Sequence, residues 1–300
     1  MLLSIWQTSG RRTSGDAFEA FEERCVVTVS ALYVYPVKSM RGIPHAQVRV
    51  SATGLDWDRQ WMVVDGKGTF LSQRTHPLLA RIVPEITADA LLLNAPDSRP
   101  LRVPFATTGD EVPVRVWKDQ CVGVEQGAAA NEWVSRFLGR QVRLVRVAPD
   151  MERRANAQFA GSIPAPLAFP DGYPMLVCNE ASLEDLNARL REQLPMERFR
   201  PNLVLQGLPA WAEDHIDTLS IGPVTLRLVK PCTRCAIPSL DHRTGQPATD
   251  PLPVLRKFRF DKALRGITFG ENAVIVTGAG ALIERGAQCQ VSFETPAAPA

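Results

Sequence analysis

Short segments with strand-like patterning follow one another at close spacing through most of this chain, and they constrain its fold more than any other feature. The pattern starts at Val26 with VVTVSALYVYPV and continues through HAQVRVSATGL and RQWMVVDGKGTFLSQ. In the last of these, the four residues 65–68 (DGKG) separate two strand-like runs, which is typical of a β-hairpin. Because many short strands in series favour sandwiches or barrels, we expect one or two barrel-like sheets.

Helical patterns are few. Residues 127–140, GAAANEWVSRFLGR, carry an apolar stripe at helical spacing and a glycine near the end, which predicts an amphipathic helix. A second helix is expected with Ser182 as its N-cap. Residues 151–170 show neither the helical nor the strand periodicity, which predicts a loop, and a loop of this length is often functional. The predicted fold class is therefore α+β and strand-dominated.

The length of the chain suggests more than one domain. Its 300 residues exceed what a single hydrophobic core usually organises. We expect a smaller, mainly β domain over residues 27–125 and a second domain over residues 126–294. Residues 1–26 are expected to form a loosely ordered extension, and residues 295–300 a disordered tail.

Charge and cysteine content exclude several classes of protein. The formal net charge is only +2, so a nucleic-acid polymer is not an expected partner. The six cysteines are scattered except for one pair, which is unlike a disulfide framework and favours a reducing, cytoplasmic setting. Because no apolar run reaches the roughly 18 residues of a membrane span, we expect no membrane association.

The cysteine pair lies in VKPCTRCAIP, residues 229–238, and allows several interpretations. A structural zinc site needs four ligands, and only His242 lies nearby as a further candidate. A thioredoxin-like redox pair needs a helix after the first thiol, which Pro238 opposes. Two packed cysteines in a turn are the simplest alternative.

The neighbours of the pair add a fourth interpretation. Lys230 and Arg234 flank the cysteines and would favour a thiolate if they lie close to one. A thiolate among cationic groups suits a soft metal that is carried by an anionic, phosphate-bearing cofactor. One protein thiolate is then enough, because the cofactor supplies the other ligands.

Several segments, in order, resemble one known family. The chain from Leu32 to Phe293 is similar to MOSC-domain molybdenum enzymes, especially the bacterial and mitochondrial amidoxime-reducing type. The resemblance implies a mainly β N-terminal MOSC domain followed by a MOSC β-barrel. The segments that carry it are YPVKSMRG at 35–42, GLDWDRQWMVVD at 54–65, FRPNLVLQG at 199–207, WAED at 211–214, KPCTRC at 230–235, SLDHRTGQ at 239–246 and FGEN at 269–272.

The family implies a molybdenum cofactor, in which a phosphate-bearing pterin dithiolene and one protein cysteine hold the metal. By its position in KPCTRC, Cys235 is implied as that metal ligand and as the catalytic residue, while Cys232 is implied to be structural.

Further residues are carried over as contacts to this cofactor. Arg59 and Arg200 have guanidinium groups that suit anion and pterin contacts, and the Asn202 amide can both donate and accept. At Gly172 only a backbone contact is implied. The complete implied cofactor-binding set is Lys38, Ser39, Arg59, Asp171, Gly172, Arg200, Asn202, Thr233, Arg234 and Asn272.

The resemblance further implies a reductase of N-oxygenated compounds, in which reduced molybdenum takes an oxygen atom from a small N–OH substrate. Because no C-x4-C-x2-C cluster is present, electrons are expected from a separate protein of the ferredoxin or flavin reductase type. A molybdenum-cofactor carrier, a sulfur-handling protein and a zinc-stabilised interaction module remain alternatives.

Overall fold

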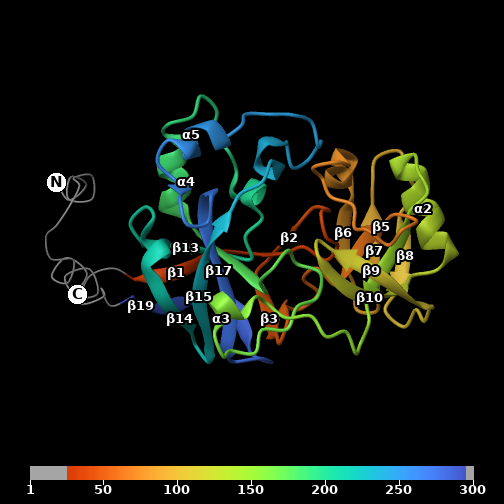
Figure 1. Ribbon diagram of the computed structural model, residues 1–300, viewed down its shortest axis with the longest axis horizontal. Helices are drawn as coiled ribbons and strands as arrows, with labels where there is room; N and C mark the ends of the chain where they lie inside the picture. Colours follow the sequence, from red (N-terminus) through yellow and green to blue (C-terminus); the bar gives the residue numbers. More distant parts are fainter. Residues whose placement is uncertain (1–25, 295–300) are drawn as a thin grey trace, which may run out of the picture.

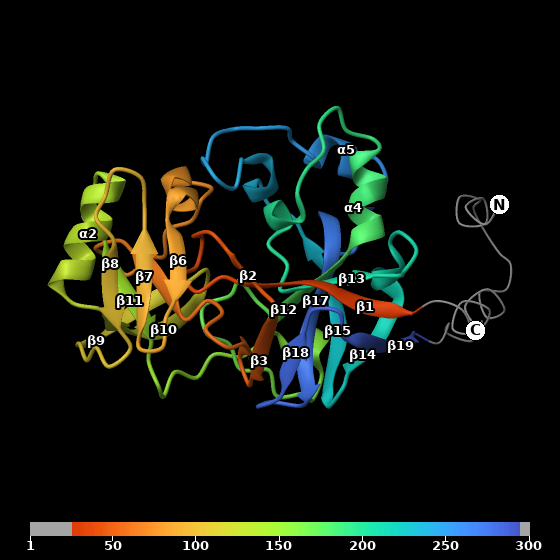
Figure 2. The same cartoon turned by 180° about the vertical axis from the view of Figure 1, so that it is seen from behind.

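The computed structural model describes residues 26–294, so the predictions for residues 1–25 and for the tail at 295–300 lie outside the described residues. Two strand-rich units lie side by side in it (Figures 1 and 2). The barrel unit comprises residues 27–45 and 175–293, and the N-terminal unit comprises residues 61–147. The strand-dominated α+β class is confirmed.

The barrel unit is a closed antiparallel barrel apart from one parallel contact. Seven strands follow one another around it, and the pairing of the first with the last closes the ring. Only the β12–β13 pair is parallel. In spatial order the strands are β12 (Met175–Asn179), β13 (Leu203–Gln206), β1 (Val27–Val34), β19 (Gln288–Phe293), β14 (Ile216–Ile221), β15 (Val224–Thr233) and β17 (Gly266–Thr277).

The barrel is filled by the apolar faces of alternating residues. Val27 and Val29, then Leu32 and Val34, of β1 face one core cluster, and the irregularity between Val29 and Ala31 shifts the alternation of two by one residue. Two short strands extend the sheet, β2 (Ile43–His45) beside β1 and β16 (Phe260–Asp261) beside β17. A separate small sheet joins β3 (Gln47–Ser51) to β4 (Gly54–Leu55) and to β18 (Leu282–Glu284).

Short helices pack against the strands of the barrel. They are α3 (Ala157–Ala160), α4 (Glu180–Asn187), α5 (Leu252–Arg256) and the 3-10 turns η2 (Met196–Phe199), η3 (Ala212–His215) and η4 (Ile237–Ser239). The prediction that Ser182 caps α4 is wrong. Asn179 is the N-cap and accepts from the Ala181 amide. Ser182 is fully buried and instead donates to the Glu213 carboxylate at 2.7 Å.

The N-terminal unit contains two sheets and one long helix. The first sheet has the order β5 (Trp61–Val64), β11 (Arg143–Val147), β10 (Asp119–Glu125) and β9 (Glu111–Val116). The second has the order β6 (Val83–Ile86), β7 (Ala90–Asn94) and β8 (Leu101–Pro104), and a 3-10 turn, η1 (Pro77–Arg81), precedes it. The predicted amphipathic helix is confirmed as α2 (Ala128–Leu138), which ends at Gly139 with φ 66°.

Two segments belong to a different unit from the one that the domain ranges expected from the sequence gave them. Strand β1, expected in the first domain, pairs with β13 and β19 in the barrel. Helix α2 and strand β11, expected in the second domain, belong to the N-terminal unit, because β11 pairs with β5 and β10. Residues 126–147 therefore pack with the unit that precedes them.

Trp57 joins the two units, and Gly54 holds the small sheet close to the chain that leads into β12. Trp57 packs against the core clusters of both units. Gly54, at φ 130°, lies so close to the Pro174 carbonyl that a Cβ would come within 2.7 Å of that oxygen, so only glycine fits. Within residues 26–294, no helix is long and apolar enough to cross a membrane.

Candidate active site

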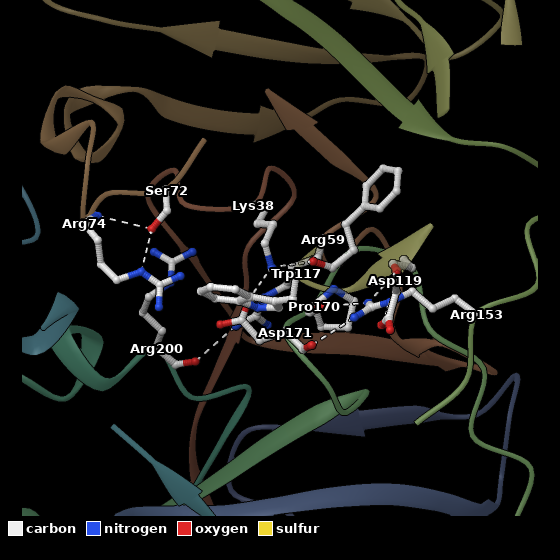
Figure 3. A network of polar contacts seen from close by, with 12 residues as sticks. Lys38, Arg59, Ser72, Arg74, Trp117, Asp119, Arg153, Pro170, Asp171 and Arg200 are labelled. Carbon is white, nitrogen blue, oxygen red and sulfur yellow. Dashed lines mark hydrogen bonds and ion pairs between the residues drawn. The ribbon is translucent and has the colours of Figure 1, made fainter. Parts of the chain in front are cut away.

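A pocket lies where the two units meet, and it gathers every residue that the sequence analysis assigned to cofactor contact. Figure 3 shows part of its wall and the polar network beside it. The loops after β1 and before β5 supply one side of the pocket, and the end of β15, the middle of β17 and the chain before β12 supply the other. The lining includes Lys38, Ser39, Arg59, Asp171, Gly172, Arg200, Asn202, Thr233, Arg234, Cys235 and Asn272, together with Arg74, Tyr173 and Cys232.

Lys38 is buried in the pocket wall and is held by two oxygens. Its amide donates to the Trp61 carbonyl at 2.7 Å, which ties the loop to β5. Its ammonium donates to the Phe169 carbonyl at 2.8 Å and to the Asp171 carboxylate at 2.5 Å. Burial lowers the pKa of Lys38, and the Asp171 carboxylate opposes that shift. Lys38 therefore links the pocket wall to the loop at 168–171.

Asp171 is the acidic residue of the lining. Its carboxylate accepts from Lys38 and, at 3.0 Å, from the indole of Trp117 (Figure 3). Although burial acts in the opposite direction, the contact with Lys38, aided by Trp117, holds the pKa of Asp171 well below its usual range. The side chain is still 59% exposed, so water screens this charge strongly. Beside it, a Cβ built at Gly172 would meet nothing within 4 Å, which leaves the backbone open to the pocket.

Arg153, which the sequence analysis did not identify, holds the loop that carries Asp171. Its guanidinium is buried and donates to the carbonyls of Ala168, Pro170 and Asp171 at 2.7–3.2 Å. Its Nε donates to the Asp119 carboxylate at 2.9 Å. Arg153 thus ties the loop at 168–171 to Asp119 of β10 (Figure 3). No motif in the sequence indicates this role, because it depends on which carbonyls the side chain reaches.

Arg59 and Arg200 lie over the same aromatic ring. Their guanidinium carbons are 4.3 and 4.2 Å from the centroid of the Tyr35 ring. Arg59 also donates to Asp58, and Arg200 donates to the Met40 carbonyl at 2.7 Å. Burial lowers the pKa of Arg200 to about 10, which still leaves it charged at neutral pH. Cation–π contact is the physical link between these two cations and Tyr35, the residue that follows β1.

The backbone at these positions is unusual. Ser39, Arg59 and Arg200 have φ angles of 67°, 48° and 58°. A non-glycine residue in this left-handed region costs of order 1 kcal/mol, and such residues are concentrated at functional sites. Three of the lining residues share this feature, so the surrounding contacts hold these side chains against a local conformational cost.

Asn202 connects the arginines to the barrel. It is almost fully buried, and its Oδ1 accepts from Arg59 at 3.0 Å and from the Leu176 amide at 3.1 Å. Its Nδ2 donates to the Tyr33 carbonyl at 3.2 Å. These contacts occupy much of the hydrogen-bonding capacity of the amide side chain. Asn202 therefore orients Arg59 in this structure.

The cysteine loop begins where β15 ends. Thr233 pairs with Thr268 of β17, and the Arg234 amide donates to the Ile267 carbonyl at 2.7 Å. The Arg234 guanidinium donates back to the Cys232 sulfur at 3.0 Å and to the Phe199 carbonyl at 2.7 Å. Cys235 follows as a free, partly exposed thiol in the pocket wall.

Asn272 reaches the pocket from the neighbouring strand. It pairs with Lys230 of β15, and its side-chain amide donates to the Lys230 carbonyl at 3.1 Å. Gly270, just before it, has φ 73° and lies where a Cβ would come within 2.7 Å of the Val177 carbonyl. This glycine allows β17 to pass close to β12.

The charges of the lining suit an anion. Arg74, Arg200 and Arg234 join Lys38 and Arg59, whereas Asp171 is the one carboxylate in the lining. Two buried donor groups of the lining, Nε of Arg234 and the hydroxyl of Tyr173, have no hydrogen-bond partner among the described residues. Buried donors are normally satisfied, so these two are consistent with a ligand that brings acceptor atoms.

The geometry also places the nearby acid Asp241 and bears on the zinc alternative. Asp241 accepts from the amides of Arg243 and Thr244 and so forms a turn; it does not line the pocket. In the part of the chain that the structure describes, no group of three or more His, Cys, Asp or Glu side chains is placed to hold a metal ion. A zinc site built from protein ligands alone is therefore not formed by these residues.

Comparison with known proteins identifies both parts of the chain. Residues 26–141 match the model of the MOSC N-terminal beta barrel domain, and residues 164–290 match that of the MOSC domain. A solved structure of a Bacillus subtilis protein covers 90% of this chain and 97% of its own at 8% identity, but its TM-score of 0.40 is too low to support an argument.

Curated relatives match across most of the chain. Human mitochondrial amidoxime-reducing component 1 is 36% identical over 244 residues, which cover 78% of this chain and 72% of the relative. Human mitochondrial amidoxime reducing component 2 is 33% identical over 78% of this chain and 73% of the relative. The names place these relatives in mitochondria, which does not match the cytoplasmic setting expected here. The chain belongs to the MOSC-domain family that includes the amidoxime-reducing components.

Proposed function

We propose that this protein is a molybdenum-cofactor-dependent reductase of small N-oxygenated compounds such as amidoximes and hydroxylamines. The single observation that carries the proposal is the pocket itself: its lining brings the free Cys235 thiol together with cationic side chains and with all the cofactor contacts implied by the family resemblance. The names of the relatives, which describe amidoxime reduction, support the same class of substrate.

The pocket residues fit the proposed cofactor chemically. Cys235 is the protein ligand to the metal in this proposal. The cations Lys38, Arg59 and Arg200 are suited to the phosphate and to the electron-rich edges of the pterin. The unpartnered Arg234 Nε and Tyr173 hydroxyl supply further donors. Ser39, Asp171, Gly172, Asn202, Thr233 and Asn272 complete the proposed contacts.

The reaction consumes two electrons and two protons. When bound, the cofactor supplies a metal centre that accepts the oxygen atom of an N–O bond. The substrate N–OH becomes N–H, and the oxygen leaves as water. The protein side chains bind and orient: Arg234, hydrogen-bonded to Cys232 and Phe199, fixes the loop that presents Cys235, and Asn202 keeps Arg59 in place.

Electrons are proposed to come from a separate redox protein. The supporting observation is compositional: no C-x4-C-x2-C cluster of the kind that binds a plant-type iron–sulfur centre is present in the sequence. A cytoplasmic or other reducing compartment is consistent with the free cysteines of the described residues.

Reduction of benzamidoxime by the holoenzyme, driven by chemically reduced methyl viologen, tests the proposal. Formation of benzamidine at a rate proportional to bound molybdenum is expected. Molybdenum-loaded protein that releases its cofactor readily and forms no benzamidine would instead favour a cofactor carrier or sulfur-handling protein.

A further inference from the structure

One short segment carries much more positive charge than the chain as a whole. Residues 256–268, here called the basic hairpin, run from the end of α5 through β16 into β17. Arg256, Lys257, Lys262 and Arg265 are all exposed there, and Asp261 is the one acidic residue in the hairpin. The formal net charge of the complete chain is only +2, so this charge is local.

Two phenylalanines on the same segment face solvent. Phe258 is 37% exposed and Phe260 is 44% exposed. Arginines lie over both rings, Arg189 at 4.6 Å from the centroid of Phe258 and Arg256 at 5.6 Å from that of Phe260. Exposed aromatic and arginine side chains in one place are characteristic of protein interfaces rather than of ordinary surface.

The basic hairpin is joined directly to the loop that carries Cys235. The Ile267 carbonyl accepts from the Arg234 amide at 2.7 Å, and Thr268 pairs with Thr233. Gly266 packs so closely on Thr233 that a Cβ would come within 2.8 Å of that side chain. A protein seated on the hairpin would therefore lie next to the backbone that leads into the candidate metal ligand.

We propose that the basic hairpin is the docking face for an acidic one-electron carrier protein of the ferredoxin type. This inference rests on the proposed function, because the reductase needs two electrons per substrate and therefore two successive dockings. Opposite charge on the two partners steers their encounter, while a small contact keeps the complex short-lived, as electron-transfer encounters require. Phe258 and Phe260 provide the apolar contact within the charged rim.

The test compares two double variants with equal change in charge. Lys257→Glu/Lys262→Glu reverses two exposed charges on the hairpin. Arg99→Glu/Arg285→Glu reverses two exposed charges outside it, one in the turn before β8 and one in the turn after β18. Each holoenzyme is assayed for benzamidoxime reduction at low and high ionic strength. The reductant is either a plant-type ferredoxin kept reduced by its reductase or reduced methyl viologen. Lys257→Gln/Lys262→Gln serves as a milder second variant.

The hairpin variant should raise the KM for ferredoxin about tenfold at low salt and lose most of its salt dependence. Turnover with methyl viologen should stay at the wild-type rate, and the control variant should behave as wild type with both reductants. Wild-type kinetics of both hairpin variants with ferredoxin, or an equal loss in the control, would overturn the proposal. So would a wild-type enzyme that uses methyl viologen but not ferredoxin.

A failure of the proposed function would look different. The wild type would then reduce no benzamidoxime even with methyl viologen. Calorimetric titration with ferredoxin still decides the docking in that case. Binding that the hairpin variant loses and the control keeps supports the docking face, and equal binding by all three proteins, or none by the wild type, refutes it.

Discussion

The guanidinium of Arg234 donates a hydrogen bond to the sulfur of Cys232 at 3.0 Å, two residues back along the chain. The two cysteines of the pair are therefore not equivalent. Both thiols are free and line the pocket, but the Cys232 sulfur accepts the hydrogen bond that holds Arg234, and the proposed metal ligand is Cys235. An arginine before the second cysteine thus has a structural reason, which a symmetric metal-binding pair would not require.

Replacement of Cys232 should affect stability more than cofactor content. Cys232→Ser keeps an acceptor for Arg234, so molybdenum content should stay near that of the wild type. Cys232→Ala leaves the donor without a partner and should lower the free energy of unfolding by about 1 kcal/mol, measured by urea titration. Complete loss of molybdenum in Cys232→Ser would contradict the unequal roles of the two cysteines.

Arg153→Lys should loosen the loop at 168–171. A lysine cannot reach three carbonyls and a carboxylate at once, so we expect a loss of about 3 kcal/mol in the free energy of unfolding. Retention of the cofactor should fall as well, because Asp171 and Lys38 lose their fixed positions. The neighbouring Arg154 is exposed, and Arg154→Lys is the matched control, with an expected change below about 0.5 kcal/mol. Similar stability of the two variants would show that Arg153 is not a clamp.

Tyr35 should matter through its ring and not through its hydroxyl. The hydroxyl is buried without a hydrogen-bond partner among the described residues, so Tyr35→Phe should be neutral or slightly stabilising. Tyr35→Leu removes the ring under Arg59 and Arg200 and should cost about 1 to 2 kcal/mol beyond its packing loss. Urea unfolding and cofactor content of the two variants provide the comparison. Equal effects of Phe and Leu would rule out the stacking role.

Two buried carboxyl groups should make the protein less stable as pH rises. Burial raises the pKa of Glu213 to about 7 and that of Glu271 to about 10. Because both values lie above those of the unfolded chain, the folded state binds more protons. The associated stability is complete below about pH 4.5 and is lost as pH rises toward 7 for Glu213 and toward 10 for Glu271.

Glu271→Gln should flatten this decline, since the amide cannot ionise. The free energy of unfolding of the variant and of wild type should diverge between pH 5 and 9, with the variant relatively more stable at the alkaline end. Glu284→Gln, at an exposed position of β18, is the control and should run parallel to wild type. Parallel curves for Glu271→Gln as well would mean that Glu271 does not retain its proton in the folded protein.

Local patterns were sufficient for much of the fold. The helix at α2 and the strand-rich character follow from periodicity and from a terminal glycine. The assignment of β1 to the barrel did not follow, because its partners β13 and β19 lie far along the chain and local alternation carries no information about them. The predicted N-cap of α4 was wrong because the Ser182 hydroxyl donates to the buried Glu213 carboxylate, a contact that no local pattern indicates.

The candidate site shows the same division. The ordered motifs named residues that do line one pocket. The sequence did not indicate three residues whose roles depend on contacts between distant segments. Arg153 donates to carbonyl oxygens, Trp117 donates its indole N–H to Asp171, and the Tyr35 ring lies under an arginine. Such roles depend on tertiary distances, which a single sequence does not encode in any local pattern.

The most direct test of the account is the metal and pterin content of the purified protein, measured by elemental analysis and by fluorescence of the oxidised pterin. Wild type produced under molybdenum-replete conditions should contain about one molybdenum and one pterin per chain, and Cys235→Ser should lose most of the metal. Zinc in place of molybdenum, or undiminished molybdenum in Cys235→Ser, would contradict the central claim that Cys235 anchors a molybdenum cofactor in this pocket.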